Sequence, residues 1–230
     1  SMSEREDTDL TRDAILRGRL QLWQPRRGYR FSVDALLLAH FAHAHRPPGE
    51  HRVADLGAGC GVVGLAAAVT RPEARVTLVE LQERLAELSQ RNATENDLAN
   101  RVRVVAGDLR RLKRLVPGDR YDSVLSNPPF RPAGAGRLSP DRERALAHTE
   151  LEVTLPDVVA SAARLLRARG VMSVVYPAER LPELLTACAE RDLRPIRLQP
   201  VHPRPGEPAR RILLAARKGG GTPLCLEAPL

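Results

Sequence analysis

Arg52-Val53-Ala54-Asp55-Leu56-Gly57-Ala58-Gly59-Cys60-Gly61 is the stretch that decides the fold of this 230-residue chain. A short apolar run ends at Asp55 and enters a glycine-rich turn, and the small and apolar residues 62–70 that follow predict a buried helix. Glycines let the backbone approach a ligand closely, and a helix N-terminus adds a partial positive charge. The stretch therefore predicts a strand–turn–helix unit with a ligand site at the turn.

The next apolar run, Val76–Val79, ends in Glu80. A carboxylate about 20 residues beyond a glycine-rich turn is placed to hold a ribose diol. Gly59-Cys-Gly-Val-Val-Gly64 also fits the dinucleotide fingerprint, which is a weak signal by itself. These residues leave unresolved whether the ligand is a nicotinamide dinucleotide or S-adenosylmethionine (SAM).

A second informative stretch, Ser126-Asn127-Pro128-Pro129-Phe130, follows the apolar run 121–125. Asn127 offers an amide oxygen as an acceptor, and the prolines fix the backbone so that the Pro128 carbonyl is free to accept. Phe130 offers a flat face on which a base can stack. Two acceptors beside an aromatic ring suit an exocyclic aromatic amine, although a proline-rich turn that ends a strand explains the same residues.

From residue 51 onward, apolar runs alternate with helical patterns, which is typical of a parallel, doubly wound sheet. The expected strands cover residues 52–55, 76–80, 102–106, 121–125, 171–176, 195–201 and 211–216. The expected helices include 62–70, one with Leu81, Leu85 and Leu88 on its apolar face, one from a Thr154–Asp157 capping box to Gly170, and one with Leu181, Leu184, Leu185 and Cys188 on one face. Because the last two strands follow one another, we expect an antiparallel final pair in a seven-stranded, mostly parallel, Rossmann-like α/β sheet with helices on both faces.

Residues 10–48 form a lead-in to this pattern. We expect a helix over Leu10–Arg19, short strands at Leu20–Trp23 and Tyr29–Phe31, and a helix capped by Ser32 with Val33, Leu36, Leu37 and Phe41 on one face. Residues 1–9 are expected to be disordered, with Ser1-Met2 resembling a tag-cleavage scar, and 219–230 to form a tail. The prediction is a single domain over residues 10–218.

The composition favours a polyanionic partner. The net charge of +8 favours RNA. Nearly all of the positive charge is arginine, which a GC-rich genome also explains. Cys60, Cys188 and Cys225 are odd in number and fit no metal-ligand pattern, so we expect a reducing cytoplasm and no metal. No apolar run approaches the ~20 residues of a membrane span.

The Gly-, Pro- and Arg-rich residues 131–150 predict a functional or disordered loop, in which we expect four arginines to contact RNA: Arg131, Arg137, Arg142 and Arg144.

The two motifs occur in the order found in class I SAM-dependent amino methyltransferases, which the chain resembles. Over about Leu20–Gly220 it resembles the bacterial valine-tRNA adenine-N6 methyltransferases. That resemblance rests on Gln24–Asp34 and Val201–Gly206 together with the two motifs, and Phe130 stands where many relatives have tyrosine. It implies methyl transfer from SAM to the amino group of the adenine just 3′ of the anticodon, by an enzyme that we expect to be a monomer.

The resemblance also implies the site residues. Catalysis falls to Asn127, Pro128, Pro129 and Phe130, with the Asn127 oxygen and the Pro128 carbonyl each accepting one N–H of the amine. SAM binding falls to Phe31, Ser32, Asp34, Asp55, Gly57, Gly59, Gly61, Glu80, Leu81, Asp108, Leu109 and Asn127. Asp108 also fits a helix N-cap, and one side chain seldom serves both purposes.

Two alternatives remain open. The first is an enzyme of the same fold that methylates guanine in ribosomal RNA or glutamine in protein, because the tetrapeptides of these enzymes overlap. The second is a nicotinamide-dependent oxidoreductase built on Gly59–Gly64, which leaves Asn127–Phe130 unexplained.

Overall fold

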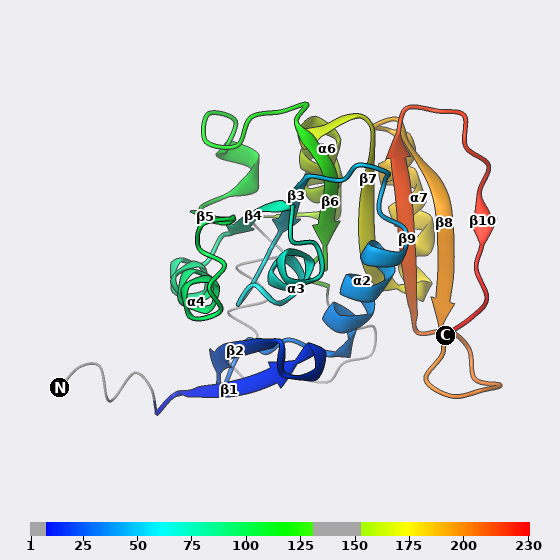
Figure 1. The fold of residues 1–230 in the computed structure, drawn as a ribbon. Helices are drawn as coiled ribbons and strands as arrows, with labels where there is room; N and C mark the ends of the chain where they lie inside the picture. Colours follow the sequence, from blue (N-terminus) through cyan, green and yellow to red (C-terminus); the bar gives the residue numbers. More distant parts are fainter. Residues whose placement is uncertain (1–7, 131–152) are drawn as a thin grey trace.

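The computed structural model describes residues 8–130 and 153–230. Its centre is an eight-stranded sheet in the order β10-β8-β9-β7-β6-β3-β4-β5, with a separate antiparallel hairpin, β1-β2, below one edge of it (Figure 1). The strands are β1 (Leu10–Ile15), β2 (Leu20–Pro25), β3 (Arg52–Leu56), β4 (Arg75–Glu80), β5 (Val102–Ala106), β6 (Tyr121–Ser126), β7 (Leu166–Pro177), β8 (Leu193–Val201), β9 (Arg211–Lys218) and β10 (Cys225–Leu226).

The sheet is parallel except at β9, which runs antiparallel to both β7 and β8. The expected antiparallel final pair is therefore confirmed. The number of strands is eight rather than the expected seven, because Cys225–Leu226 pairs in parallel with Arg197–Leu198 at the edge of the sheet. Two residues can add a strand there because β8 has an open edge to receive them.

Helices cover both faces of the sheet, as expected for a doubly wound fold (Figure 1). One core contains residues of α2 (Val33–Ala44), α3 (Val62–Thr70), α4 (Glu83–Glu95) and the hairpin, and the other contains residues of α6 (Leu155–Leu165) and α7 (Leu181–Ala189). Three short 3-10 helices complete the described elements: η1 (Leu16–Gly18), η2 (Leu109–Arg111) and η3 (Ala178–Arg180).

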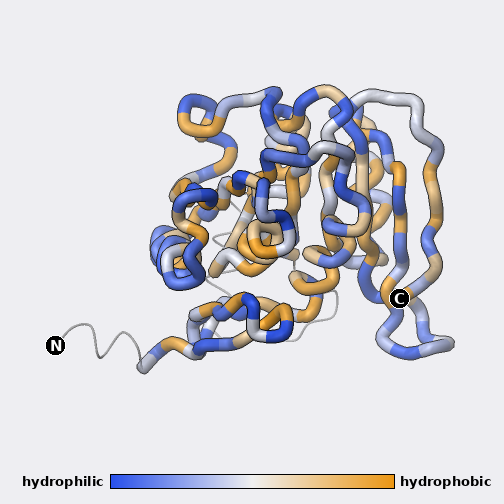
Figure 2. Tube along the Cα trace, viewed as in Figure 1, coloured by the Kyte–Doolittle hydropathy of each residue, from blue (hydrophilic) through white to orange (hydrophobic). Residues whose placement is uncertain are grey.

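Neighbouring residues on a strand enter different cores because strand side chains alternate between the faces. In β6, Val124 packs into the core beneath α6 and Leu125 into the core beneath α3. Hydrophobic residues recur along the strands in the middle of the sheet, whereas the turn between β8 and β9 is hydrophilic (Figure 2). The sheet thus separates two aliphatic cores.

The lead-in departs from its predicted structure. Leu10–Ile15 is a strand and not the start of a helix, because its exposed and covered residues alternate and it pairs with β2 along its whole length. Tyr29–Phe31 is not a strand, since the Phe31 N–H donates to the Gln24 side chain instead of to a neighbouring strand.

Two helix predictions are also corrected. Of the predicted stripe on α2, Phe41 is buried as expected, Leu36 and Leu37 are partly buried, and Val33 is 64 % exposed. The helix also buries Ala35, Leu38 and Ala42, so its buried face is rotated from the predicted one. The helix that begins with the Thr154–Asp157 capping box ends at Leu165 and not at Gly170, because β7 already starts at Leu166. The capping box itself is confirmed: Thr154 Oγ1 accepts from the Asp157 N–H and Asp157 accepts from the Thr154 N–H. On α7, Leu185 is exposed, outside the predicted buried face.

Among the helices of residues 8–130 and 153–230, none combines the length and the apolar character needed to cross a membrane.

Candidate active site

Both sequence motifs leave the sheet side by side at the carboxyl ends of β3 and β6. These strands are parallel neighbours with Leu56 opposite Ser126, and the Ser126 hydroxyl donates to the Leu56 carbonyl at 3.0 Å. Gly57 and Asn127 are the next residues of each chain segment. The chain proceeds to β4 on one side of β3 and returns to β6 on the other, and ligands of open α/β sheets bind at such a switch point.

The glycine-rich turn has a backbone that only glycine adopts easily. Gly57, Gly59 and Gly61 all have positive φ, and Gly61, at 95°, is the N-cap of α3. Close packing adds a second constraint at Gly64, where a Cβ would overlap the Leu78 side chain. The glycines at these positions therefore determine the shape of the turn, and α3 begins directly after it.

Asp55 sits at the base of the turn and is only 2 % exposed. Its Oδ2 accepts a hydrogen bond from the Gly64 N–H at 2.9 Å, which ties the end of β3 to the first turn of α3. Burial raises the pKa of Asp55 to about 7, the Gly64 hydrogen bond opposes this shift, and the neighbouring Glu80 carboxylate adds to it. Asp55 thus carries a carboxyl whose charge depends on pH near neutrality.

Glu80 ends β4 beside the same turn and is 6 % exposed. Its Oε1 accepts from the Gly59 N–H at 2.8 Å and its Oε2 from the Gln82 N–H at 2.7 Å. Burial raises its pKa, and these backbone donors oppose the shift. Each carboxylate oxygen has a second lone pair, so Glu80 can both shape the turn and accept from a ligand hydroxyl.

Helix α4 supports the turn from behind, which the sequence analysis missed. The Ser89 hydroxyl donates to the Gly59 carbonyl at 2.6 Å, and the Asn92 amide donates to the Cys60 carbonyl at 2.8 Å. The same Asn92 accepts from the Trp23 N–H at 2.8 Å and donates to the Trp23 carbonyl at 2.9 Å. One buried amide therefore fixes the hairpin and the turn to each other.

Tyr29 is a second residue that the sequence analysis missed. A Cβ on Gly59 would overlap the Tyr29 phenol, so the ring lies directly against the glycine-rich turn. The Tyr29 side chain is 37 % exposed, but its hydroxyl is packed against the turn, and this loss of hydration raises the pKa of Tyr29 well above its ordinary value. Cys60, Asp55 and Glu80 raise it further. A ligand that reaches the turn at Gly59 must contact or displace this ring. Its signal in the sequence is its place within Gln24–Asp34, the segment that carries the family resemblance.

The lead-in residues proposed for SAM lie between the hairpin and α2. Phe31 is partly buried, Ser32 is the exposed N-cap of α2 without a side-chain capping bond, and Asp34 is in the first turn. Asp34 forms an ion pair with Arg211 at the start of β9, with 2.9 Å between its Oδ2 and the arginine Nε.

Arg211 connects this lead-in to the tetrapeptide. Its guanidinium lies over the Phe130 ring, 4.7 Å from the centroid, while its Nε donates to Asp34. The other neighbour of Phe130 is Tyr176, whose ring meets it edge-on at 6.1 Å between centroids. The position of Phe130 is therefore set by an arginine about 80 residues further along the chain, which no local pattern in the sequence indicates.

Asn127 is partly exposed, and its side chain makes no hydrogen bond within residues 8–130 and 153–230. Pro128 is buried, and Pro129 and Phe130 are partly buried. Pro129 also borders a cavity of about 770 Å³ between α6 and α7, whose lining includes Tyr176 and Arg180 but neither Glu80 nor Asn127. Among the described residues, the tetrapeptide thus presents the Asn127 amide at the switch point without a hydrogen-bond partner, and Pro129 lines a separate cavity.

Asp108 acts as an N-cap. Its Oδ1 accepts from the Arg110 N–H at 2.9 Å, and both oxygens bond the Arg110 guanidinium, which lowers the pKa of Asp108. Of the two roles that the sequence allows, the structure gives it this one. Leu81 is partly buried and Leu109 buried, and both pack in the core beneath α6.

Arg131, Arg137, Arg142 and Arg144 lie outside the described residues. Within 8–130 and 153–230, no group of three or more His, Cys, Asp or Glu side chains is arranged to hold a metal ion.

Comparison with known proteins adds an independent finding. Residues 32–186 match the family model described as the methyltransferase small domain. The chain is 31 % identical to the tRNA1(Val) (adenine(37)-N6)-methyltransferase of Porphyromonas gingivalis, covering 80 % of this chain and 72 % of that protein. It is 30 % identical to the enzyme of the same name from Aeromonas hydrophila, covering 81 % and 76 %. A solved structure from Agrobacterium tumefaciens, described as a predicted O-methyltransferase, superposes with a TM-score of 0.67 at 28 % identity over 86 % of each chain.

Proposed function

Because the chain belongs to the methyltransferase small domain family, we propose that it transfers the methyl group of SAM to the N6 amino group of an adenine in tRNA. The finer assignment, to the adenine just 3′ of the anticodon of valine tRNA, rests on the names of its relatives. The observation that carries the proposal is the position of the Asn127 amide beside the glycine-rich turn, at the switch point of the sheet, with no hydrogen-bond partner among residues 8–130 and 153–230.

The residues at the turn fit SAM. Glu80 has acceptor capacity left for a ribose hydroxyl. The space beside Gly59 holds the Tyr29 ring, which would move aside for a ligand at the turn. When bound there, SAM would supply an electrophilic methyl group. Glu80 would orient the ribose, the Gly57–Gly61 turn would support the ligand, and Tyr29 with the Phe31–Asp34 segment would close over it.

The acceptor chemistry explains why an amide and a carbonyl suffice. The lone pair of an adenine amine is delocalised into the ring, so the amine is a poor nucleophile. If the Asn127 oxygen and the Pro128 carbonyl each accept one N–H, the nitrogen is drawn toward tetrahedral geometry. Positive charge only moves from sulfur to nitrogen, so no strong base is needed before attack, and proximity with alignment supplies most of the rate.

Phe130 would hold the flipped adenine by stacking on the ring face that Arg211 does not cover. The arginine fixes the ring on one side and Tyr176 meets its edge, so the stacking surface is already in place before the base arrives. The net charge of +8 supports a tRNA partner, and a tRNA substrate supports a cytoplasmic location.

Other acceptors are less well supported. Guanine in ribosomal RNA and glutamine in protein fit the same acceptor pair, but the relatives that cover most of the chain are named for tRNA adenine. The family match covers Gly59–Gly64 within a methyltransferase domain, so the nicotinamide oxidoreductase is set aside.

The decisive experiment incubates the protein with radiolabelled SAM and total tRNA and identifies the modified nucleoside. We expect N6-methyladenosine in valine tRNA. Label in guanosine, or in no tRNA, would contradict the proposal.

Asn127→Ala tests the mechanism. It should bind SAM normally, because SAM contacts fall mainly to the turn and Glu80, yet lose about 2–4 kcal/mol of transition-state stabilisation. Single-turnover methylation and SAM calorimetry measure the two separately. Phe130→Tyr keeps the stacking ring and is the matched control, expected to be close to wild type. A normal single-turnover rate in Asn127→Ala would remove the tetrapeptide from the mechanism.

A further inference from the structure

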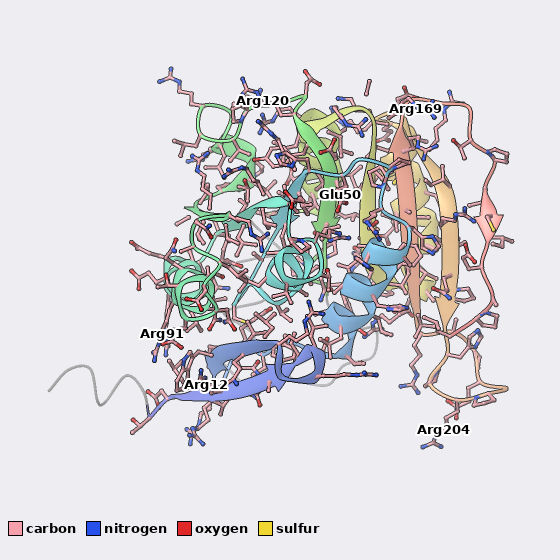
Figure 3. All side chains as sticks on the ribbon, viewed as in Figure 1. Arg12, Glu50, Arg91, Arg120, Arg169 and Arg204 are labelled. Carbon is pink, nitrogen blue, oxygen red and sulfur yellow. The ribbon has the colours of Figure 1, made fainter. Side chains whose placement is uncertain are left out.

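A pocket lined by arginine lies at the amino-terminal ends of β3, β4, β5 and β6, opposite the strand ends that carry the candidate active site. Its volume is about 390 Å³, and its lining includes Arg52, Arg75, Arg101, Arg103 and Arg120 but no aspartate or glutamate. Arg120 lies at the end of the molecule farthest from the β1-β2 hairpin (Figure 3). The pocket is thus a concentration of positive charge away from the catalytic edge.

The sheet register places three of these arginines on one face. Arg52 of β3 pairs directly with Arg75 of β4, and Arg103 of β5 pairs with Thr77, two residues beyond Arg75. Side chains at alternate strand positions share a face, so Arg52, Arg75 and Arg103 continue the face that carries Ala54, Val79 and Val105 in the core beneath α6. Where that core ends, arginines replace the aliphatic residues, and the Thr77–Tyr121 hydroxyl pair forms the boundary.

This charge has no counterion in the described residues. The side chains of Arg52, Arg75, Arg103 and Arg120 are exposed and form no ion pair or hydrogen bond with residues 8–130 or 153–230. The two carboxylates next to β3 and β6 are already taken: Glu50 pairs with Arg71 at 2.6 Å, and Asp122 pairs with Arg167. Adjacent strands lie about 4.8 Å apart, well inside the ~10 Å screening length at 0.1 M salt, so these arginines repel one another.

We propose that Arg52, Arg75, Arg103 and Arg120 of this pocket bind phosphate groups of the RNA substrate's backbone. The fifth arginine, Arg101, already donates to the backbone carbonyls of Ala68, Arg71 and Ala74. Guanidinium forks match phosphate oxygens in geometry and charge, and an anion would relieve the repulsion between Arg52 and Arg75. The strands of five or six residues separate the pocket from the strand ends by about 20 Å, so a stem continuing from the flipped base can run along the β4-β5 side of the sheet. The inference rests on the proposed function, because it takes tRNA as the substrate.

The test compares two double variants with the same change in charge. Arg75→Gln/Arg103→Gln removes two pocket arginines. The control, Arg191→Gln/Arg194→Gln, removes two exposed arginines: Arg191 of the turn between α7 and β8, and Arg194 near the start of β8, which pairs with Asp192. Binding of purified tRNA is measured between about 50 and 200 mM KCl. The pocket variant should lower the slope of log K against log salt by about 1.5, as expected for two lost phosphate contacts, and the control should leave it unchanged. SAM affinity should stay at the wild-type value in both, because neither pair makes contacts at the turn. The pocket variant should be at least as stable to heat as the wild type, because it loses like-charge repulsion, so weaker tRNA binding would not reflect unfolding.

An unchanged slope in the pocket variant, or an equal loss in both variants, would overturn the proposal. Calorimetry with inorganic triphosphate tests whether the pocket binds a free polyphosphate instead. If the pocket variant loses triphosphate binding while the salt slope of its tRNA binding is unchanged, the pocket binds a free polyphosphate and not RNA. Methylation of tRNA by the wild-type protein distinguishes failure of this inference from failure of the proposed function. If the wild type forms no N6-methyladenosine, the proposed function fails, whatever the salt slopes show.

Discussion

Asp55 is the residue at which burial and charge conflict most directly. Its carboxyl is almost completely buried and its pKa is raised from 3.8 to about 7, chiefly by the loss of hydration. A carboxyl with a raised folded-state pKa stabilises the fold fully below its unfolded pKa, and this contribution is lost as the pH rises through the folded value.

Asp55→Asn should remove this pH dependence while keeping an acceptor for the Gly64 N–H. Urea unfolding between pH 4 and about 7.5 should show wild-type stability declining relative to the variant as the pH rises, by up to about 4 kcal/mol in total. The two curves should then run parallel above pH ~7.5. Curves that are parallel over the whole range would show that Asp55 does not titrate there.

Arg211 is a positioning residue at the same scale. Asp34, Arg211 and Phe130 come from three distant parts of the chain, and the arginine contacts both of the others. Arg211→Met should therefore lower kcat/KM for tRNA by an amount equivalent to about 1–3 kcal/mol of transition-state stabilisation, because the ion pair and the cation–π contact are lost. The effect on SAM affinity should be smaller. Arg211→Lys should recover part of the loss. A double-mutant cycle with Asp34→Asn measures the coupling, and strictly additive effects would mean that the pair does not act as a unit.

At the scale of elements, α4 acts as a partner for the edge of β2. Asn92 and Asn96, one helical turn apart, bond both backbone groups of Trp23 and of Gln21 respectively, as a neighbouring strand would. Asn92 also donates to the Cys60 carbonyl, whereas the further bond of Asn96 goes to the Asn92 carbonyl of its own helix. The two asparagines thus share one role, and Asn92 adds a second role at the glycine-rich turn.

The pair provides a matched comparison. Asn92→Ala leaves buried backbone groups without partners and should cost about 2–4 kcal/mol of stability. Asn96→Ala should cost less, because the Asn96 side chain is partly exposed. SAM affinity should fall in Asn92→Ala and stay constant in Asn96→Ala. Calorimetry at a temperature where both variants are folded measures the two SAM affinities. Equal affinities would show that the bond from Asn92 to Cys60 does not support SAM binding at the turn.

At the scale of the whole molecule, the C-terminal segment covers the edge of the sheet. Beyond the β10–β8 pairing, the Glu227 N–H donates to Leu198, and Leu230 exchanges backbone bonds with Pro200 and His202. Glu227 also pairs with Arg197 at 3.0 Å. Figure 1 shows this segment running the length of β8, so it closes one of the two open edges.

Removal of residues 221–230 should expose that edge. We expect a loss of about 1–3 kcal/mol in urea unfolding, set by a few partly exposed hydrogen bonds, and concentration-dependent association in size-exclusion chromatography. SAM affinity should be unchanged, because β10 lies on the far side of the sheet from β4. Unaltered stability and elution would mean that the segment contributes nothing to the edge.

The elements that depend on near neighbours in the chain can be read from the amino-acid sequence. The β3–turn–α3 unit, β5 and the capping box of α6 follow from alternation, glycine conformation and hydrogen bonds that reach three or four residues. The order of the two motifs pointed to an amino methyltransferase for the same reason, since each motif is a short continuous stretch.

The contacts that join distant segments arise only in the folded chain. The clamp of Asn92 on Trp23 and Cys60, the Tyr29 ring against Gly59 and the Arg211 bridge from Asp34 to Phe130 each link residues with no periodic relation in the chain. Leu10–Ile15 became a strand because β2 was there to pair with it, and the arginines of three separate strands met because the sheet aligned their ends. Side-chain pairing and like-charge proximity are properties of distances in space, and those distances exist only once the sheet has formed.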